Sequence, residues 1–75
     1  MRAIFQERRD YRDRCVLSFF SDEWTGIVDL ITRHGGRYGT FRASANRLVE
    51  AGELERVWDG NERFGRYVYR RIYKQ

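Results

Sequence analysis

The sequence predicts a small, mainly α-helical domain in which three helices are followed by a small antiparallel β-hairpin. Three observations support this fold class. The chain has 75 residues, which is enough for one domain with a small core, residues 1–75, and leaves no room for a second. Apolar residues recur at helical spacing in the first two thirds of the chain, whereas residues 54–73 alternate as strands do. Proline is absent, so glycines and helix caps must end the elements.

The first expected element is a helix over residues 3–19. Its apolar stripe is expected to consist of Ile4, Tyr11, Cys15 and Phe19. The run CVLSFF is rich in strand-forming residues, so a strand from Cys15 to Phe20 is a competing prediction. Cys15 is the only cysteine, which excludes a disulfide within the chain, and we interpret it as a small core residue.

The second expected element is a helix over residues 22–34, capped by Ser21 or Asp22 and ended by two glycines. Its apolar residues at helical spacing are Trp24, Ile27, Val28, Leu30 and Ile31. Arg33 and His34 lie in the last turn, where their side chains complement the helix dipole. Gly26 costs roughly 1 kcal/mol relative to alanine inside a helix, which indicates a close approach by a neighbouring helix.

The third expected element is a helix over residues 40–51, with Thr40 as its N-cap and Gly52 just beyond its end. Its predicted buried face consists of Phe41, Ser44 or Ala45, and Leu48. Its predicted exposed face consists of Arg42, Ala43, Asn46, Arg47 and Glu50. The buried face is short of large side chains, so this helix can lie close to its neighbour.

The last expected element is a hairpin over residues 54–73, in which ELERVWD and RYVYRRIYK are joined by the glycine-framed loop DGNERFG. Tyr67, Tyr69 and Tyr73 fall on one face of the second strand. We expect them to pack across the strands with Trp58, and stacking on nucleic-acid bases is the alternative.

The charges of the chain are arranged in blocks. The net charge is +4, and 14 of the 15 basic residues are arginine. Successive segments carry +2 (residues 1–14), −3 (15–32), +4 (33–47), −3 (48–59) and +4 (60–75). A protein that uses charge only for solubility intersperses the two signs, so these blocks favour an anionic partner.

Several function classes find no support in the sequence. It has one histidine and one cysteine, no paired nucleophile and base, no phosphate-binding glycine loop and no cluster of metal ligands. We therefore expect neither an enzyme nor a cofactor nor a metal site. Because no signal-peptide pattern and no stretch of about 20 apolar residues is present, we expect no membrane association and a cytoplasmic location.

Residues 22–73 resemble the winged helix-turn-helix family, chiefly through the stretch TFRASANRLVEAGELERV. In that family the second helix of the pair begins at a serine or threonine cap, carries apolar residues at fixed places before a glycine, and continues as Gly-x-Leu-x-Arg into the wing. The matching positions here are Phe41, Ser44 or Ala45, Leu48, Gly52, Leu54 and Arg56. The turn HGGRYG departs from the pattern, because the family usually has a short apolar segment there.

The resemblance implies that helix 40–51 enters the major groove of double-stranded DNA. The DNA-binding residues that it implies are Arg37, Tyr38, Thr40, Arg42, Ala43, Asn46, Arg47, Arg63 and Arg66. Arg42 would contact guanine, Asn46 adenine and Ala43 a thymine methyl group. Thr40 and Arg47 would contact phosphates, and Arg63 and Arg66 in the wing, residues 59–66, would follow the backbone or reach the minor groove. Arg37, Arg42, Asn46 and Arg47 have no evident role in the core.

Two functional hypotheses follow. The first is a transcriptional regulator that binds specific sequences of double-stranded DNA, associates with the nucleoid and forms a homodimer through residues 3–19, because one such module contacts only a short half-site. The second is a winged-helix adaptor or inhibitor, of the kind found in phages and mobile elements, that docks on an acidic or nucleic-acid-binding protein. An architectural role, with weak sequence preference and DNA bending, lies between the two.

Overall fold

A computed structural model describes residues 4–73 of the chain, and their side chains from residue 8 onward. The elements, in order, are α1 (Ile4–Ser18), β1 (Thr25–Gly26), α2 (Ile27–His34), α3 (Tyr38–Glu50), β2 (Leu54–Gly60) and β3 (Gly65–Arg71). The three helices and the antiparallel hairpin are confirmed, but β1 joins the hairpin and makes a three-stranded sheet of order β1-β3-β2. The fold is therefore mixed α/β.

The first helix is confirmed through Ser18, and its extension to Phe19 and the competing strand from Cys15 are both wrong. The hydrogen bonds from the Phe19 and Phe20 amides to carbonyls three residues earlier close the last turn. Ala3, where the prediction began the helix, lies outside the described residues.

The buried side of α1 differs from the predicted stripe. Val16 and Phe20 are each only 3% exposed, whereas Tyr11 is 73% exposed. Cys15 is only partly buried, and the side chain of Ile4 lies outside the described residues. Val16 of α1 and Phe20 just beyond it therefore enter the core, one position along from the predicted Cys15 and Phe19, while Phe19 is partly buried and packs against the core.

The second helix begins at Ile27, so the predicted start at residue 22 and the cap at Ser21 or Asp22 are wrong. Thr25 and Gly26 instead pair with β3, which holds this segment extended and moves the helix start beyond it. Gly26 is the N-cap, and its backbone N–H donates to Asp29 Oδ2 at 3.2 Å. A Cβ at Gly26 would lie 2.7 Å from the Arg66 guanidinium, so the close approach comes from a strand side chain rather than from a helix.

The third helix begins at Tyr38 with Arg37 as its cap residue, so Thr40 lies in the first turn and is not the cap. The turn before it needs glycine: Gly36 has φ +109°, and a Cβ there would collide with the Phe41 ring. The helix ends at Glu50 rather than residue 51, and Gly52 follows with φ +77°. Glycine just past the last turn is as predicted.

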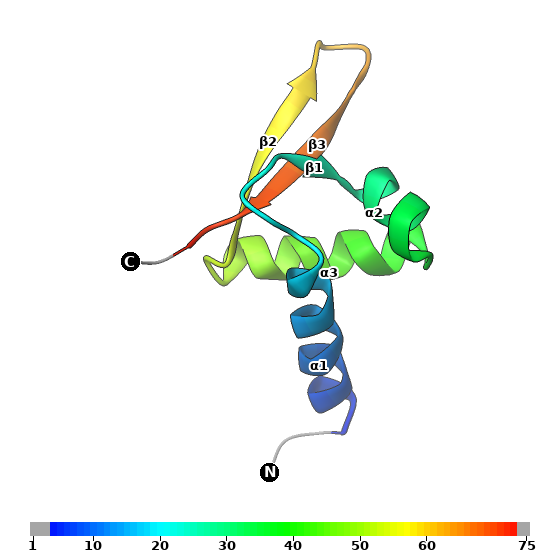
Figure 1. Ribbon diagram of the computed structural model, residues 1–75, viewed down its shortest axis with the longest axis vertical. Helices are drawn as coiled ribbons and strands as arrows, with labels where there is room; N and C mark the ends of the chain where they lie inside the picture. The colour runs from blue at the N-terminus through cyan, green and yellow to red at the C-terminus, as the bar shows by residue number, and fades with distance from the viewer. Residues whose placement is uncertain (1–3, 74–75) are drawn as a thin grey trace.

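The β2–β3 hairpin extends away from the helices on one side of α3, and α1 extends on the other (Figure 1). In the hairpin, the pairing of β2 with β3 runs from Leu54 opposite Arg71 to Gly60 opposite Gly65. The second strand therefore ends at Arg71, two residues before the predicted end. At the turn, Asn61 Oδ1 accepts hydrogen bonds from the backbone N–H groups of Arg63 and Phe64, each at 2.9 Å, which fixes the shape of the hairpin end.

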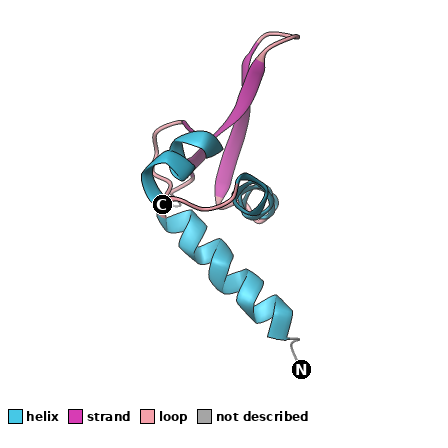
Figure 2. Ribbon diagram, turned by 90° about the vertical axis from the view of Figure 1, so that its right-hand side faces the viewer, coloured by secondary structure: helices cyan, strands magenta, loops and turns pink. Residues whose placement is uncertain are grey.

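The core lies where α3 crosses α1 and the base of the sheet, as seen along the α3 axis in Figure 2. Its buried side chains are Val16, Phe20, Ile27, Leu30, Phe41, Ala45, Leu48, Leu54 and Tyr69. The predicted buried face of α3 is confirmed, with both Ser44 and Ala45 fully buried. Helix α3 is thus fixed from below by α1 and from above by the hairpin.

Candidate nucleic-acid interface

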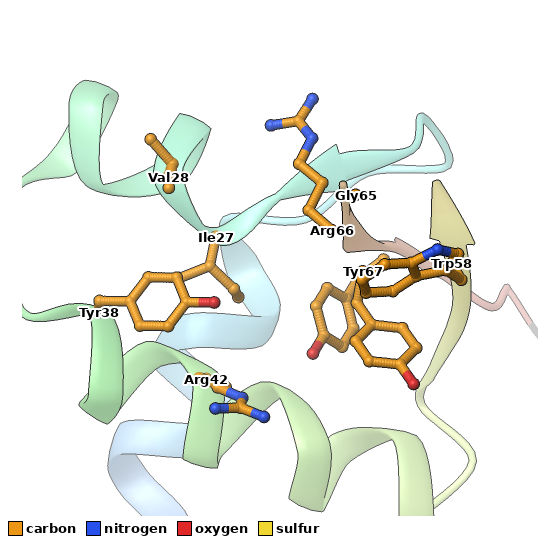
Figure 3. A pocket seen from close by; sticks show the side chains of 9 residues that line it. Ile27, Val28, Tyr38, Arg42, Trp58, Gly65, Arg66 and Tyr67 are labelled. Atoms are coloured by element: carbon orange, nitrogen blue, oxygen red, sulfur yellow. The ribbon is translucent and has the colours of Figure 1, made fainter. Parts of the chain in front are cut away.

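A groove of about 210 Å³ lies between α3 and the hairpin, and we call it the helix–hairpin groove. Its walls include Val28, Tyr38, Arg42, Trp58, Arg66 and Tyr67. In Figure 3, Tyr38 and Arg42 come from α3, whereas Trp58, Tyr67 and Arg66 come from the hairpin. The groove therefore combines a helix wall and a strand wall, and each carries an arginine and at least one aromatic ring.

The two arginines of the groove differ in how they are held. Arg42 is exposed, and among the side chains of residues 8–73 no carboxylate pairs with its guanidinium. Arg66 Nη1 lies 3.2 Å from Asp29 Oδ2, and the two side chains are 51% and 42% exposed. An exposed ion pair of this kind contributes only about 0–1 kcal/mol. Arg66 can therefore leave Asp29 and bind another anion with little loss of stabilising free energy.

The aromatic side chains of the strand wall are fixed by their neighbours. Trp58 and Tyr67 are opposite each other in the register and meet edge to face, with ring centroids 5.1 Å apart. Trp58 Nε1 donates to the Asn61 carbonyl at 3.1 Å, and the Arg56 guanidinium lies 4.5 Å from the centre of the Tyr67 ring. The expected packing of Trp58 with a tyrosine of β3 is confirmed, and the partner is Tyr67.

Asn46 joins α3 to the base of the hairpin. Its Oδ1 accepts hydrogen bonds from the Tyr69 hydroxyl at 2.9 Å and from Arg56 Nη1 at 3.0 Å. Tyr69 is buried, and this burial raises the pKa of its hydroxyl in spite of the nearby Arg56 and Arg42 charges. Asn46 therefore has a structural role that the sequence did not reveal, and its oxygen is already engaged.

Arg47 lies at the interface between α3 and α1. Its Nε and Nη2 donate to the two carboxylate oxygens of Asp13, each at 2.8 Å, and Nη2 also lies 3.2 Å from Ser44 Oγ. Burial alone would raise the pKa of the Asp13 carboxyl, but the hydrogen bonds from Arg47 and Ser44 and the positive charges of Arg47 and Arg12 outweigh it and lower this pKa. The expectation that Asn46 and Arg47 have no role in holding the core together is wrong.

The remaining predicted residues of α3 lie near its N-terminal end. Arg37, Tyr38, Thr40 and Ala43 are all exposed, and α3 has no acidic residue in its first turn. With the side chains described from residue 8 to residue 73, Arg37 and the neighbouring Arg33 at the end of α2 form no ion pair. Since the N-terminal end of a helix also carries a partial positive charge, this end of α3 is suited to anions.

The predicted residues of the hairpin are separated from one another. Arg66 lies in the helix–hairpin groove, whereas Arg63 is exposed at the far end of the hairpin. Phe64 beside it is 78% exposed. Tyr38, Arg42 and Arg66 therefore line the same groove, and Arg63 lies apart from it.

Sequence reasoning missed Trp58 and Tyr67 as groove residues. Their signal was present, because alternation places both side chains on the same face of the two paired strands. What the sequence lacked was the opposite wall, which depends on how α3 crosses the base of the hairpin.

Comparison of the chain with protein-family models, with curated proteins and with solved structures gives no match. Among the described residues, no group of three or more histidine, cysteine, aspartate or glutamate side chains could hold a metal ion. Within the same part of the chain, none of the helices is long and apolar enough to cross a membrane.

Proposed function

We propose that the protein is a winged helix-turn-helix DNA-binding protein, with α3 as the recognition helix and the β2–β3 hairpin as the wing. The element order α1-β1-α2-α3-β2-β3 and the sheet order β1-β3-β2 are compatible with this arrangement. The observation that carries the proposal is the groove that both Arg42 of α3 and Arg66 of the hairpin line, with the Arg66 guanidinium pointing away from Arg42 (Figure 3) and paired with Asp29. A cation on the helix and a second cation on the hairpin suit a duplex in which the recognition helix reads base edges and the wing contacts the phosphodiester backbone.

In this proposal the exposed residues of α3 approach the major groove. Arg42 would donate to guanine O6 and N7, and Ala43 would contact a thymine methyl group. Arg37, Tyr38 and Thr40 would contact phosphates at the entrance to the groove. These residues are exposed, so no core contact has to be broken.

Asn46 and Arg47 would contribute differently from the other residues of α3. Asn46 would offer adenine only its amide Nδ2–H₂ group while Tyr69 and Arg56 hold its oxygen. Arg47 would reach a phosphate only after leaving Asp13, so its main role is to fix the position of α3. Arg63, at the end of the hairpin, would reach the backbone or the minor groove.

The proposal includes a role as a cytoplasmic, nucleoid-associated transcriptional regulator that acts as a homodimer. One module of this size covers a short half-site, and a second copy would double the contacts. Helix α1 is the proposed dimer element, because it extends away from the side of the molecule that carries the hairpin (Figure 1). Sedimentation of the protein with and without DNA tests this, and a monomer in both states would contradict it.

Fluorescence anisotropy with a pool of random-sequence duplexes tests DNA binding. We expect binding that weakens steeply between about 50 and 200 mM salt, because each phosphate contact adds roughly −0.9 to the slope of log K against log salt concentration. Arg42→Ala should weaken binding, whereas Arg9→Ala, which removes the same charge from exposed α1, should have a smaller effect. The absence of binding to any duplex at low salt would overturn the proposal.

A second candidate function is a winged-helix adaptor or inhibitor that docks on an acidic or nucleic-acid-binding protein, as in phages and mobile elements. The observation that favours it is Phe64, which is 78% exposed at the end of the hairpin and is a suitable anchor for a protein partner. A stoichiometric complex with one purified partner that survives nuclease treatment and is lost in Phe64→Ala would support it. A complex that nuclease destroys would favour DNA binding instead.

A further inference from the structure

We infer that the helix–hairpin groove holds an unpaired nucleotide, so that the preferred DNA of this protein has a single-stranded segment next to a duplex. The inference rests on the proposed function, because it takes DNA as the ligand. It goes further by naming the form of DNA and the side chains that distinguish it. Four properties of the groove support it: its aromatic surfaces, its positive charges, its size and the fixed arrangement of its strand wall.

The aromatic surfaces of the groove are open to solvent on both walls. Tyr38 is 50% exposed on the helix wall, and Trp58 and Tyr67 are 48% and 41% exposed on the strand wall. Bases stack on aromatic side chains in proteins that bind single strands, and each stacked base contributes substantially to affinity. An unpaired base offers both faces for such stacking, whereas the bases inside a duplex cover one another and only the last base pair of a duplex end exposes one face.

The positive charges of the residues that line the groove attract the strand that carries the unpaired nucleotide. Arg42 faces the groove without an ion-pair partner among the described residues, and Arg66 is held only by its exposed pair with Asp29. Proteins that bind single strands combine a positively charged groove with aromatic stacking surfaces. Here both features lie within one groove of the chain.

The size of the groove limits what can enter it. Its volume of about 210 Å³ is below the range of roughly 300–1,000 Å³ that is typical of pockets for drug-sized molecules and cofactors. A single planar ring system fits this space better than a peptide helix or a large cofactor. The groove is also open, so the strand on either side of the bound nucleotide can leave it.

The strand wall is arranged before any ligand binds. The hydrogen bond from Trp58 Nε1 to the Asn61 carbonyl fixes the indole, and the edge-to-face contact with Tyr67 fixes the second ring. A side chain that is already held loses little conformational freedom on binding. The alternative explanation is that Trp58 and Tyr67 only stabilise the hairpin, and this alternative predicts no response of Trp58 to DNA.

The fluorescence of Trp58 provides a direct test. Trp24→Phe leaves Trp58 as the only tryptophan, since the chain contains two. The probes are a blunt duplex, the same duplex with a short oligothymidine overhang on either the 3′ or the 5′ strand, and the oligothymidine alone. We expect the overhang to quench Trp58 emission and to tighten binding on the order of 10-fold relative to the blunt duplex.

Two further variants separate stacking from hairpin stability. Tyr67→Leu keeps an apolar contact with Trp58 and removes the ring. The ratio of the affinity for the overhang duplex to that for the blunt duplex should therefore fall towards one. Tyr73→Leu removes a tyrosine that is 60% exposed and does not line the groove, so this affinity ratio should stay unchanged. Circular dichroism establishes that each variant is folded, and if Tyr67→Leu is not, the response of Trp58 in the Trp24→Phe protein decides alone.

The outcomes distinguish the two proposals. Equal binding of blunt and overhang duplexes with unchanged Trp58 emission would overturn this inference and leave duplex binding in place. Quenching by the oligothymidine without any binding of blunt duplex would support the groove as a nucleotide site and overturn recognition of the duplex. Binding of none of the probes would overturn both.

Discussion

Arg47 of α3 and Asp13 of α1 form a two-point ion pair, with Nε and Nη2 each 2.8 Å from a carboxylate oxygen. The carboxylate side chain is only 14% exposed and the guanidinium side chain 35%. Planar two-point geometry makes this the strongest type of arginine–carboxylate contact. This ion pair connects α1 with α3, the helix that we propose as the DNA-reading element. Replacing Arg47 therefore tests the stability of the fold, whereas replacing the exposed Arg42 on the same helix tests DNA binding.

Arg47→Ala should lower the free energy of unfolding by about 1.5–3 kcal/mol, because a partly buried hydrogen-bonded charge pair loses one member. Arg42→Ala on the same helix should change it by less than about 0.5 kcal/mol, since that side chain is exposed. Urea denaturation followed by circular dichroism measures both. A folded Arg47→Ala protein with unchanged stability and weakened DNA binding would show that Arg47 meets DNA instead.

The same pair predicts a pH dependence of stability. The pKa of Asp13 is lowered in the folded protein, so the folded state binds a proton less readily than the unfolded chain does. The stabilisation is therefore complete above the unfolded pKa of about 4 and is lost as the pH falls below it, through the folded pKa. Asp13→Asn should lower stability at pH 7 and reduce its dependence on pH in this acidic window. An equally steep fall in Asp13→Asn would assign the acid sensitivity to other carboxylates.

Gly36 and Gly39 form a matched pair on either side of the start of α3. Gly36→Ala should destabilise the protein by more than about 1 kcal/mol, because φ is +109° and the new Cβ would collide with the Phe41 ring. Gly39→Ala should stabilise it by about 0.4–1 kcal/mol, because this helical position has open space around it and alanine restricts the unfolded chain. Thermal unfolding measures both, and equal effects would mean that the turn has a different conformation.

The elements that the sequence predicted well are those that depend on local periodicity. The buried face of α3, with Phe41 and Leu48, follows from helical spacing, and the hairpin follows from alternation around a glycine-framed loop. The start of α2 could not be predicted in this way. Thr25 and Gly26 are extended because they pair with Tyr69 and Val68, more than 40 positions further along the chain.

The same distinction applies to the candidate site. The spacing placed Arg42, Asn46 and Arg47 on the polar side of α3 and could not tell them apart. The role of each side chain depends on a partner that lies far away in the sequence. Asp13 is 34 positions away from Arg47, and Tyr69 is 23 positions away from Asn46. Arg42 has no such partner among the described side chains, so only the tertiary structure distinguishes it from Asn46 and Arg47.

Arg42 and Arg63 should affect DNA binding in different ways, because one lies on the proposed recognition helix and the other at the end of the proposed wing. If Arg42 reads guanine, Arg42→Ala should cost about 1–3 kcal/mol on the preferred site and relax specificity at one position. If Arg63 contacts phosphate, Arg63→Ala should weaken binding to all sequences alike and reduce the salt slope by about 1. Arg70→Ala is the control, because Arg70 pairs with Glu55 and stacks on Trp24, outside the groove. Selection of bound sequences from a random duplex library, followed by salt titration of each variant, measures both effects. Identical behaviour of all three variants would mean that binding depends on net charge alone.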